Sequence, residues 1–255
     1  MPSIIRKIGF VAQRFGLDPR QFGAAASSVV PFVRSYAQAR KLDSREWPIE
    51  FLPALGDRAE TAGAAKGHYF HMDLWAARHV YAGRFRKVVD VGSRIDGYVA
   101  HVLSFRDIEV FDVRPLKSEV AGMTFTCADM MDPPSLAADY ADCISCLHAL
   151  EHFGLGRYGD PVDLDGWKKG LAGLAQMLAS GGTLLLAVPV GRQRIEFDAH
   201  RVFHPETIIA EADKLGLSLI DFSAVDDEGR YRTAPDMTDA KQMAYGCGCF
   251  LLRKR

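Results

Sequence analysis

Short apolar runs alternate with amphipathic stretches between residues 85 and 225. Runs such as "KVVDVG" (87–92) and "TLLLAVPV" (183–190) are continuous, which is typical of strands buried on both faces. In contrast, "WKKGLAGLAQML" (167–178) repeats its apolar residues at helical spacing. This alternation predicts an α/β domain built on a doubly wound, mostly parallel sheet. Ligands of such sheets bind beyond the carboxyl ends of the strands, so the residues that follow each strand are the candidates for a site.

The composition is that of a soluble globular chain from a reducing compartment. Hydrophobic residues make up 48% and charged residues 25% of the 255 positions. Five cysteines do not make a disulfide framework in a chain of this length. The uncharged stretch 170–191 is long enough to span a membrane, but "SGG" (180–182) interrupts it and favours a helix, a glycine turn and a buried strand. We therefore expect a cytoplasmic protein.

The first predicted strand leads into a glycine turn that matches no dinucleotide fingerprint. Gly92 allows backbone N–H groups to approach a ligand, and Gly97 allows the next helix to pack close to the sheet. Arg94 stands where the G-x-G-x-x-G pattern has its second glycine, and Asp96 replaces a small residue. This spacing argues against NAD or FAD, because a pyrophosphate needs a close approach to the backbone.

Acidic residues follow the second and third predicted strands. Asp112 comes twenty residues after Gly92, where a carboxylate can accept both hydroxyls of a ribose. Asp129 is placed to accept from an exocyclic amine such as that of adenine, and Met130 to cover the face of the ring. Together with Asp90 in the first predicted strand, these acidic residues suit a ligand with a ribose and a cationic amino-acid part. The ligand that fits this description is S-adenosylmethionine.

The segments "VVDVGS", "FDVRP", "CADMMD", "SCLHALEHFG" and "LASGGTLLLAVP" occur in this order, which resembles the cofactor half of class I methyltransferases. Residues 65–210 also resemble DUF268, an uncharacterised methyltransferase-like family often encoded near bacterial surface-glycan genes. The resemblance implies a Rossmann-like fold with a seven-stranded sheet and O-methylation of a sugar or glycan hydroxyl in surface polysaccharide biosynthesis. The alternative is a degenerate scaffold in glycan assembly, because Arg94 replaces the middle glycine of the usual D-x-G-x-G-x-G loop.

The same resemblance assigns the residues that would bind the cofactor. It places Asp90 and Gly92 at the methionine part, Asp112 at the ribose, and Asp129 with Met130 at the adenine. The full set expected to contact S-adenosylmethionine is Tyr69, Asp90, Gly92, Ser93, Arg94, Gly97, Asp112, Val113, Asp129, Met130 and Leu147.

Histidines and a glutamate follow the fourth and fifth predicted strands, on the rim where a methyl acceptor would lie. Methyl transfer needs a base if the acceptor is a hydroxyl, and histidine suits that task at neutral pH. The catalytic candidates are His148, Glu151, His152 and His200, with one histidine taking the proton and a carboxylate fixing its tautomer. The alternative is structural, in which these side chains brace the glycine-rich loop 153–166 through hydrogen bonds.

Two patterns raise the question of zinc. C-x-x-C (143–146) and C-x-C (247–249) supply four thiols, and "HALEH" (148–152) has the H-x-x-E-H form of some zinc proteases. Both cysteine pairs lie in apolar strand-like runs, where cysteine behaves as a small hydrophobe. "HALEH" begins at the end of a strand rather than within a long helix. We therefore expect no metal site.

The N-terminal segment differs in charge from the rest of the chain. Residues 1–45 carry a net charge of +6, against −1 for the whole chain. Apolar residues fall on one helical face of residues 4–15, and Asp18-Pro19 predicts the start of a second helix. We expect a basic helical extension (1–64) followed by a methyltransferase-like domain (65–255).

These features also indicate partners. The basic residues 1–45 are compatible with peripheral contact to an anionic membrane surface or a phosphate-bearing lipid-linked glycan. A small-molecule or glycan acceptor is expected, and a homodimer is a further expectation. Nucleic acid is not expected, because the chain is slightly acidic and lacks interleaved basic and aromatic residues.

Overall fold

The computed structural model describes residues 19–42, 47–56, 58, 62–133 and 138–255. The first expected N-terminal helix (4–15) lies outside the described residues. The contacts divide the chain into two compact units, residues 1–64 and residues 65–255, and each is described by itself.

Helix α2 (Pro19–Ala39) is the main element of the first unit. It begins at a proline, which is well tolerated in the first turn because the missing N–H would have no helical partner there. Phe32 and Tyr36 lie one turn apart on the helix, and the ring of Phe51 packs edge-on against both, with centroids 5.2 and 5.1 Å away. This aromatic contact brings residues near Phe51 back against the helix.

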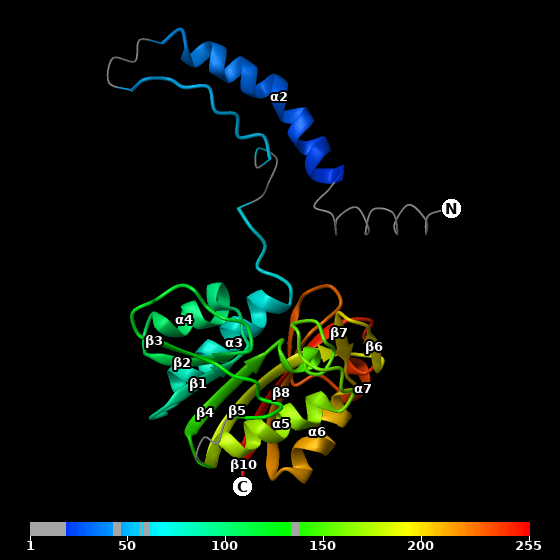
Figure 1. The fold of residues 1–255 in the computed structure, drawn as a ribbon. Coiled ribbons are helices and arrows are strands. Elements are labelled where there is room, and N and C mark those ends of the chain that lie inside the picture. Colours follow the sequence, from blue (N-terminus) through cyan, green and yellow to red (C-terminus); the bar gives the residue numbers. More distant parts are fainter. Residues whose placement is uncertain (1–18, 43–46, 57, 59–61, 134–137) are drawn as a thin grey trace. The chain divides into compact units, whose positions relative to one another are not determined.

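One sheet forms the centre of the second unit, with strand order β3-β2-β1-β4-β5-β10-β8-β9 (Figure 1). Its strands are β1 (Val88–Val91), β2 (Ile108–Asp112), β3 (Met123–Cys127), β4 (Ala141–Leu147), β5 (Leu178–Val190), β8 (Leu217–Val225), β9 (Tyr231–Thr233) and β10 (Gly246–Lys254). The strands from β3 to β5 pair in parallel, whereas β10 is antiparallel to both β5 and β8. The predicted doubly wound sheet is confirmed. It has eight strands within the described residues rather than seven, because the short β9 pairs with the edge of β8.

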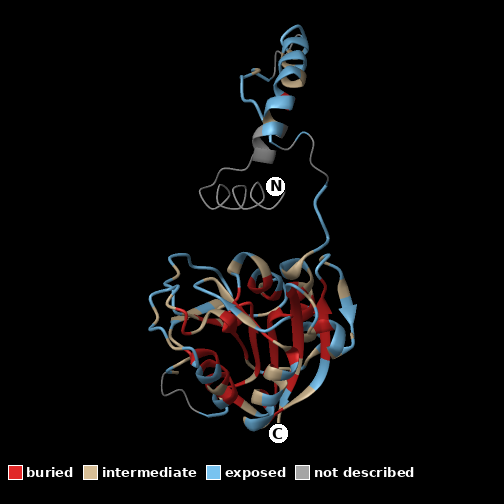
Figure 2. Ribbon diagram, turned by 90° about the vertical axis from the view of Figure 1, so that its right-hand side faces the viewer, coloured by how far each residue is buried: buried red, intermediate tan, exposed pale blue. Residues whose placement is uncertain are grey.

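The helices pack on the two faces of this sheet (Figure 1). They are α3 (His68–Ala82), α4 (Ala100–Leu103), α5 (Gly166–Met177), α6 (Pro205–Lys214) and α7 (Met237–Ala240). Helices α3 and α4 bury their apolar residues in one core cluster, and α5 and α6 bury theirs in a second cluster on the other face. Burial is concentrated in the central strands (Figure 2). A short hairpin of β6 (Arg194–Glu196) and β7 (His200–Val202) follows β5.

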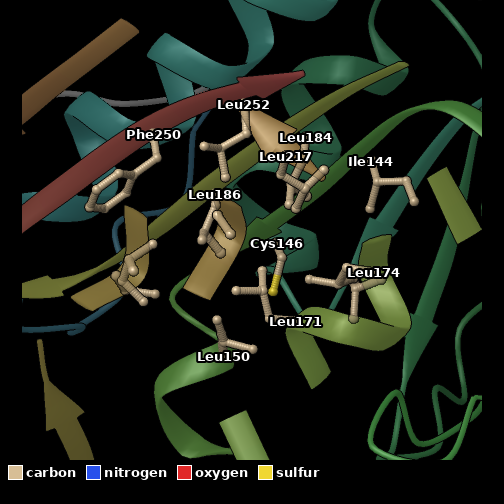
Figure 3. Packing of buried hydrophobic residues seen from close by; sticks show 14 of the residues in the cluster. Ile144, Cys146, Leu150, Leu171, Leu174, Leu184, Leu186, Leu217, Phe250 and Leu252 are labelled. Carbon is tan, nitrogen blue, oxygen red and sulfur yellow. The ribbon is translucent and has the colours of Figure 1, made fainter. Parts of the chain in front are cut away.

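Leucines dominate the core on the α5 face. Leu171 and Leu174 of α5 lie against side chains of β4 and β5, among them Cys146 and Leu186 (Figure 3). All four are fully buried, which is why α5 needs an apolar residue every three or four positions. The cysteines at 143, 146, 247 and 249 are also buried, as expected of core residues.

Strand β5 follows α5 directly, without the separate glycine turn that the sequence suggested. Ala141 pairs with Leu178 and Cys143 with Thr183, so the register shifts and residues 179–182 form an irregularity within the strand. Gly181 takes a positive φ of 71° there, a conformation that favours glycine. No helix within the described part of the chain is long and apolar enough to cross a membrane.

Candidate functional site

A hollow opens beyond the carboxyl ends of β1, β2, β3 and β4, at the point where the strand order reverses between β1 and β4. It holds about 740 Å³ of atom-free space, part of it open to solvent. Of the predicted site residues, those that line it are Tyr69, Gly92, Arg94, Asp112, Val113, Asp129, Met130, His148 and His152.

Asp90 lies beneath the hollow rather than in it. Its side chain is fully buried and accepts hydrogen bonds from the hydroxyls of Ser93 and Ser145, both at 2.6 Å, and from the backbone N–H of Ser93 at 3.0 Å. Burial raises the pKa of Asp90 to about 6, although these hydrogen bonds favour the charged form. Ser93 in turn accepts from the backbone N–H of Leu147 at 3.1 Å. Asp90 and Ser93 therefore tie the glycine turn to the end of β4, and Leu147 is a buried core residue.

The turn after β1 departs from a regular helix start. Gly92 takes a φ of 72°, and a Cβ atom there would lie 2.8 Å from the Cβ of Ala149. Residues 95–99 then form one wide helical turn before α4. Gly97 packs against α3, where a Cβ atom would lie 2.5 Å from the carboxylate of Asp73. Gly92 keeps the floor of the hollow open, whereas Gly97 serves helix packing outside it.

Arg94, which replaces the middle glycine, lies at the edge of the hollow. Its guanidinium is 4.8 Å from the ring centre of Tyr69 on α3 and forms an ion pair with Asp96 at 2.8 Å. About half of the Arg94 side chain is exposed. The arginine thus leaves the hollow open and places a positive charge on its rim.

Asp112 ends β2 and lines the hollow, as the ribose prediction requires. Its two carboxylate oxygens accept from the side chain of Arg114, from Nε at 2.9 Å and from Nη2 at 2.6 Å. The guanidinium of Arg114 also lies 4.8 Å from the ring centre of Tyr158, in the loop after β4. Arg114 was not singled out from the sequence, and only its place two residues after Asp112 could have indicated it.

Asp129 and Met130 form the part of the hollow that follows β3. An oxygen of Asp129 accepts from the backbone N–H of Met131 at 2.8 Å, which fixes the turn. Met130 is almost fully buried and belongs to the core on the α5 face. The side chain of Asp129 is partly exposed and lines the hollow. Met130 is packed in the core, and part of its side chain forms the wall of the hollow.

His148 and Glu151 form a buried pair directly after β4. Nδ1 of His148 is 2.6 Å from Oε1 of Glu151, and both side chains are at least 95% buried. Burial disfavours a charged carboxylate, but the neighbouring His148 and its hydrogen bond hold the pKa of Glu151 below its usual value. His148 takes a positive φ of 51°, held by a bond from its N–H to Ala187. Such a conformation costs about 1–3 kcal/mol and is typical of functional sites.

His68, at the start of α3, completes this cluster and was not among the predicted residues. Its Nδ1 is 3.1 Å from Nε2 of His148, with the two rings inclined by only 4°. Burial, followed by the nearby His148, lowers the pKa of His68 to about 4. Its position after a glycine, at the start of an aromatic helix, is the only sequence signal that could have drawn attention to it.

His152 presents a free ring nitrogen near the hollow. Its Nδ1 is 2.7 Å from the carbonyl oxygen of Ala199. A carbonyl oxygen only accepts, so Nδ1 carries the hydrogen and the neutral ring keeps its lone pair on Nε2. Burial lowers the pKa of His152 below its usual value, although Glu151, whose Oε1 is 3.9 Å from Nε2, opposes this shift.

His200 lies outside the hollow. Its Nε2 is 3.2 Å from a carboxylate oxygen of Glu196 but off the line of a hydrogen bond, and its ring packs on Tyr245 with centroids 5.0 Å apart. This position on the β6–β7 hairpin explains the separation, because the hairpin directs the residue toward the start of β10.

Arg201 braces the loop after β4. Its buried guanidinium donates to four backbone carbonyls, those of Glu151, Phe153, Asp163 and Leu164, at 2.6–3.3 Å. The carboxylate of Asp160 accepts from three backbone N–H groups between residues 154 and 158. This bracing, which the structural alternative assigned to the histidines, therefore comes largely from an arginine and an aspartate.

Comparison with known proteins bears on the fold. Residues 123–211 match the model of a family described as "Caenorhabditis protein of unknown function, DUF268". The matched region holds β3 to β7, with His148, Glu151 and His152 among its residues. No curated protein matches the chain in sequence.

Solved structures share the fold at low sequence identity. The Burkholderia thailandensis 1,6-didemethyltoxoflavin-N1-methyltransferase, bound to 1,6-didemethyltoxoflavin and S-adenosylhomocysteine, is 15% identical (TM-score 0.54; 93% of this chain and 91% of that one). The [4+2]-cyclase SpnF is 16% identical (TM-score 0.53; 89% and 92%). The N-methyltransferase NodS from Bradyrhizobium japonicum WM9, in complex with S-adenosyl-L-homocysteine, is 13% identical (TM-score 0.50; 88% and 98%). The chain therefore has the Rossmann-like fold of class I methyltransferases, a fold that also serves a cyclase.

Proposed function

We propose that the chain is an S-adenosylmethionine-dependent methyltransferase that methylates a hydroxyl group of a sugar or glycan. The observation that carries this proposal is that Asp112 and His152 line the same hollow. Asp112 offers a carboxylate at the strand end where a ribose is held in this fold, and His152 offers a neutral Nε2. The S-adenosylhomocysteine bound in two structures of the same fold supports the cofactor.

The residues around the glycine turn fit the methionine part of this cofactor. Gly92 leaves open the space that a Cβ atom would fill against Ala149. The guanidinium of Arg94, held over Tyr69, is placed to receive the carboxylate of an amino acid. At the position of the usual middle glycine, the charged side chain of Arg94 would thus contact the methionine part in place of the backbone.

S-Adenosylmethionine, when bound, supplies an electrophilic methyl group and leaves as S-adenosylhomocysteine once the acceptor oxygen has taken the methyl carbon. Within the chain, Nε2 of His152 takes the acceptor's proton, and the resulting imidazolium lies 3.9 Å from the Glu151 carboxylate, which stabilises it. His148 is unsuited to this role, because Glu151 and His68 engage both of its ring nitrogens. We assign the base to His152 for this reason.

We propose a hydroxyl acceptor because His152 supplies a base at the hollow. A hydroxyl needs such a base, whereas a neutral amine can be methylated without one. Two partly exposed rings on the rim, those of Tyr69 and Tyr158, support a sugar or glycan as the acceptor. Such rings combine an apolar face with a polar tip, as a sugar does. We place the reaction in the biosynthesis of surface polysaccharide, on the cytoplasmic side of the membrane.

The test is transfer of a labelled methyl group from S-adenosylmethionine to nucleotide sugars and to a polysaccharide fraction, with the full-length protein. We expect label in O-methyl sugars, and its loss with His152→Gln. Label on amines, or none with any of these acceptors while S-adenosylhomocysteine binds, would contradict the hydroxyl assignment.

The Asp112–Arg114 ion pair favours a second candidate, a binding protein without catalysis. Both oxygens of Asp112 are already satisfied within the chain, as expected if the ribose site had lost its ligand. The cyclase relative shows that the fold is not restricted to methyl transfer. Failure to bind S-adenosylhomocysteine would favour this scaffold function in glycan assembly.

We also propose that the N-terminal unit contacts an anionic membrane surface. Val30 and Val33 of α2 are at least half exposed, and Arg34, Arg40 and Lys41 are exposed beside them. The full chain should co-sediment with phosphatidylglycerol vesicles, and replacing the three basic residues by Glu should abolish this. Equal sedimentation of both proteins would contradict the proposal.

A further inference from the structure

Three residues from distant parts of the sequence converge beside the hollow, and the proposed methyl transfer uses none of them. His68 begins α3, His148 follows β4, and Cys247 is the second residue of β10. One ligand atom from each residue lies within 4.8 Å of the other two. Two imidazoles and a thiol form a donor set suited to zinc.

The two ring nitrogens are spaced as metal ligands are. Nδ1 of His68 and Nε2 of His148 are 3.1 Å apart. Two nitrogens that each lie about 2.0–2.1 Å from a tetrahedral zinc ion are separated by about 3.3 Å. The distance between the two nitrogens therefore differs by only a few tenths of an ångström from that in a zinc site.

Glu151 supplies an independent sign of such a site. Its Oε1 accepts from Nδ1 of His148 at 2.6 Å, so that the other ring nitrogen faces His68. A carboxylate bonded to the far nitrogen of a histidine is the usual support of a histidine that binds a metal. The Oε2 atom of Glu151 is buried without a hydrogen-bond partner among the described residues.

We propose that His68, His148 and Cys247 bind a divalent transition-metal ion of the zinc type, with Glu151 orienting His148. Three protein ligands leave one position of a tetrahedral shell for water or an acceptor oxygen. This site revises the expectation that the chain has no metal. The sequence patterns that suggested zinc paired cysteines with cysteines, or the two histidines of "HALEH", whereas the structure combines one member of each pattern with His68.

Cobalt titration of the metal-stripped, full-length protein tests the proposal without any assay of methyl transfer. We expect one Co²⁺ per chain, with a thiolate-to-cobalt charge-transfer band and displacement by Zn²⁺. Cys247→Ser should abolish the charge-transfer band. Cys249→Ser is the matched control, because Cys249 is equally buried on the same strand, and it should retain the band.

Two further variants keep the test decisive if Cys247→Ser does not fold. His68 is only partly buried at a helix start, so His68→Gln should fold and bind Co²⁺ at least tenfold more weakly. Glu151→Gln should weaken binding by about 10- to 100-fold. A folded wild-type chain that binds no Co²⁺, a band that persists in Cys247→Ser, or an affinity that His68→Gln leaves unchanged would overturn the proposal.

Discussion

Arg114 holds both carboxylate oxygens of Asp112. Its Nε lies 2.9 Å from Oδ1 and its Nη2 lies 2.6 Å from Oδ2, while its backbone N–H is 2.8 Å from Oδ1. Asp112 is also the residue that a ribose would contact at this strand end. The guanidinium therefore competes with the two ribose hydroxyls and has to give up at least part of the carboxylate when a nucleoside binds.

Replacing Arg114 by Ala should leave the affinity for S-adenosylhomocysteine unchanged or improve it. About half of the Arg114 side chain is exposed, and such ion pairs contribute about 0–1 kcal/mol, which corresponds to at most about a fivefold gain. Isothermal titration calorimetry measures the change. A tenfold loss of affinity would show instead that Arg114 itself contacts the ligand.

Methyl transfer should rise with pH and level off above the pKa of His152. The base acts in its neutral form, and burial holds its pKa below the usual 6.5, opposed by Glu151 and aided by Arg157 and His148. Protonation at lower pH removes the lone pair on Nε2, so the rate falls on the acid side. The pH profile of kcat/KM should show its acid midpoint below 6.5.

His152→Gln should lower kcat by about 100- to 10,000-fold, the contribution of a positioned base. Binding of S-adenosylhomocysteine should not change, because the side chain is assigned to the acceptor. A variant that keeps the full rate and the fall of kcat/KM at low pH would exclude His152 as the base. Another group near the hollow would then have to take the proton.

Alanine substitutions at two glycines with the same backbone conformation separate the stability cost of backbone strain from that of steric contact. Gly92 and Gly181 have φ angles of 72° and 71°. Alanine at either costs roughly 1–2 kcal/mol for the left-handed conformation. Only at Gly92 would the new Cβ meet another atom, at 2.8 Å from Ala149, whereas no atom of the described residues lies within 4 Å at Gly181. Urea unfolding should show a further loss of about 1–3 kcal/mol for Gly92→Ala; equal losses would mean that the contact relaxes freely.

Arg201→Lys should destabilise the chain although the charge is retained. A lysine ammonium cannot reach four carbonyls of residues 151–164 in the geometry of a guanidinium. Each buried carbonyl left without a donor costs about 1–3 kcal/mol. Urea unfolding should show the loss, and limited proteolysis should cut the loop 153–166 faster. Arg192→Lys, at an exposed position, is the matched control and should behave as wild type.

The sheet was predictable because its signals are local. Continuous apolar runs such as 183–190 and the helical spacing of Leu171 and Leu174 reflect burial that each segment shows by itself. The irregularity at 179–182 was not predictable, because "SGG" has the same turn preference inside a strand as before one. The added strand β9 is three residues long and has no such signal.

The sequence could predict a site residue only where the end of a strand determines the position of that residue. Asp112 ends β2 and His148 directly follows β4, so the fold brings them to one hollow. Asp90 lies one residue before the end of β1, but its side chain turns inward to two serines, a direction that depends on the neighbouring β4. His68 and Cys247 lie about 180 residues apart, and only the packing of α3 against the start of β10 makes them neighbours.

Calorimetric titration with S-adenosylhomocysteine, of the full-length protein and of the Asp112→Ala variant, measures whether the hollow binds this cofactor through Asp112. We expect one ligand to bind per chain at micromolar concentration and binding to be lost in Asp112→Ala, with unchanged unfolding of the variant. A wild-type chain that binds none, or a variant that binds as tightly as wild type, would contradict this expectation.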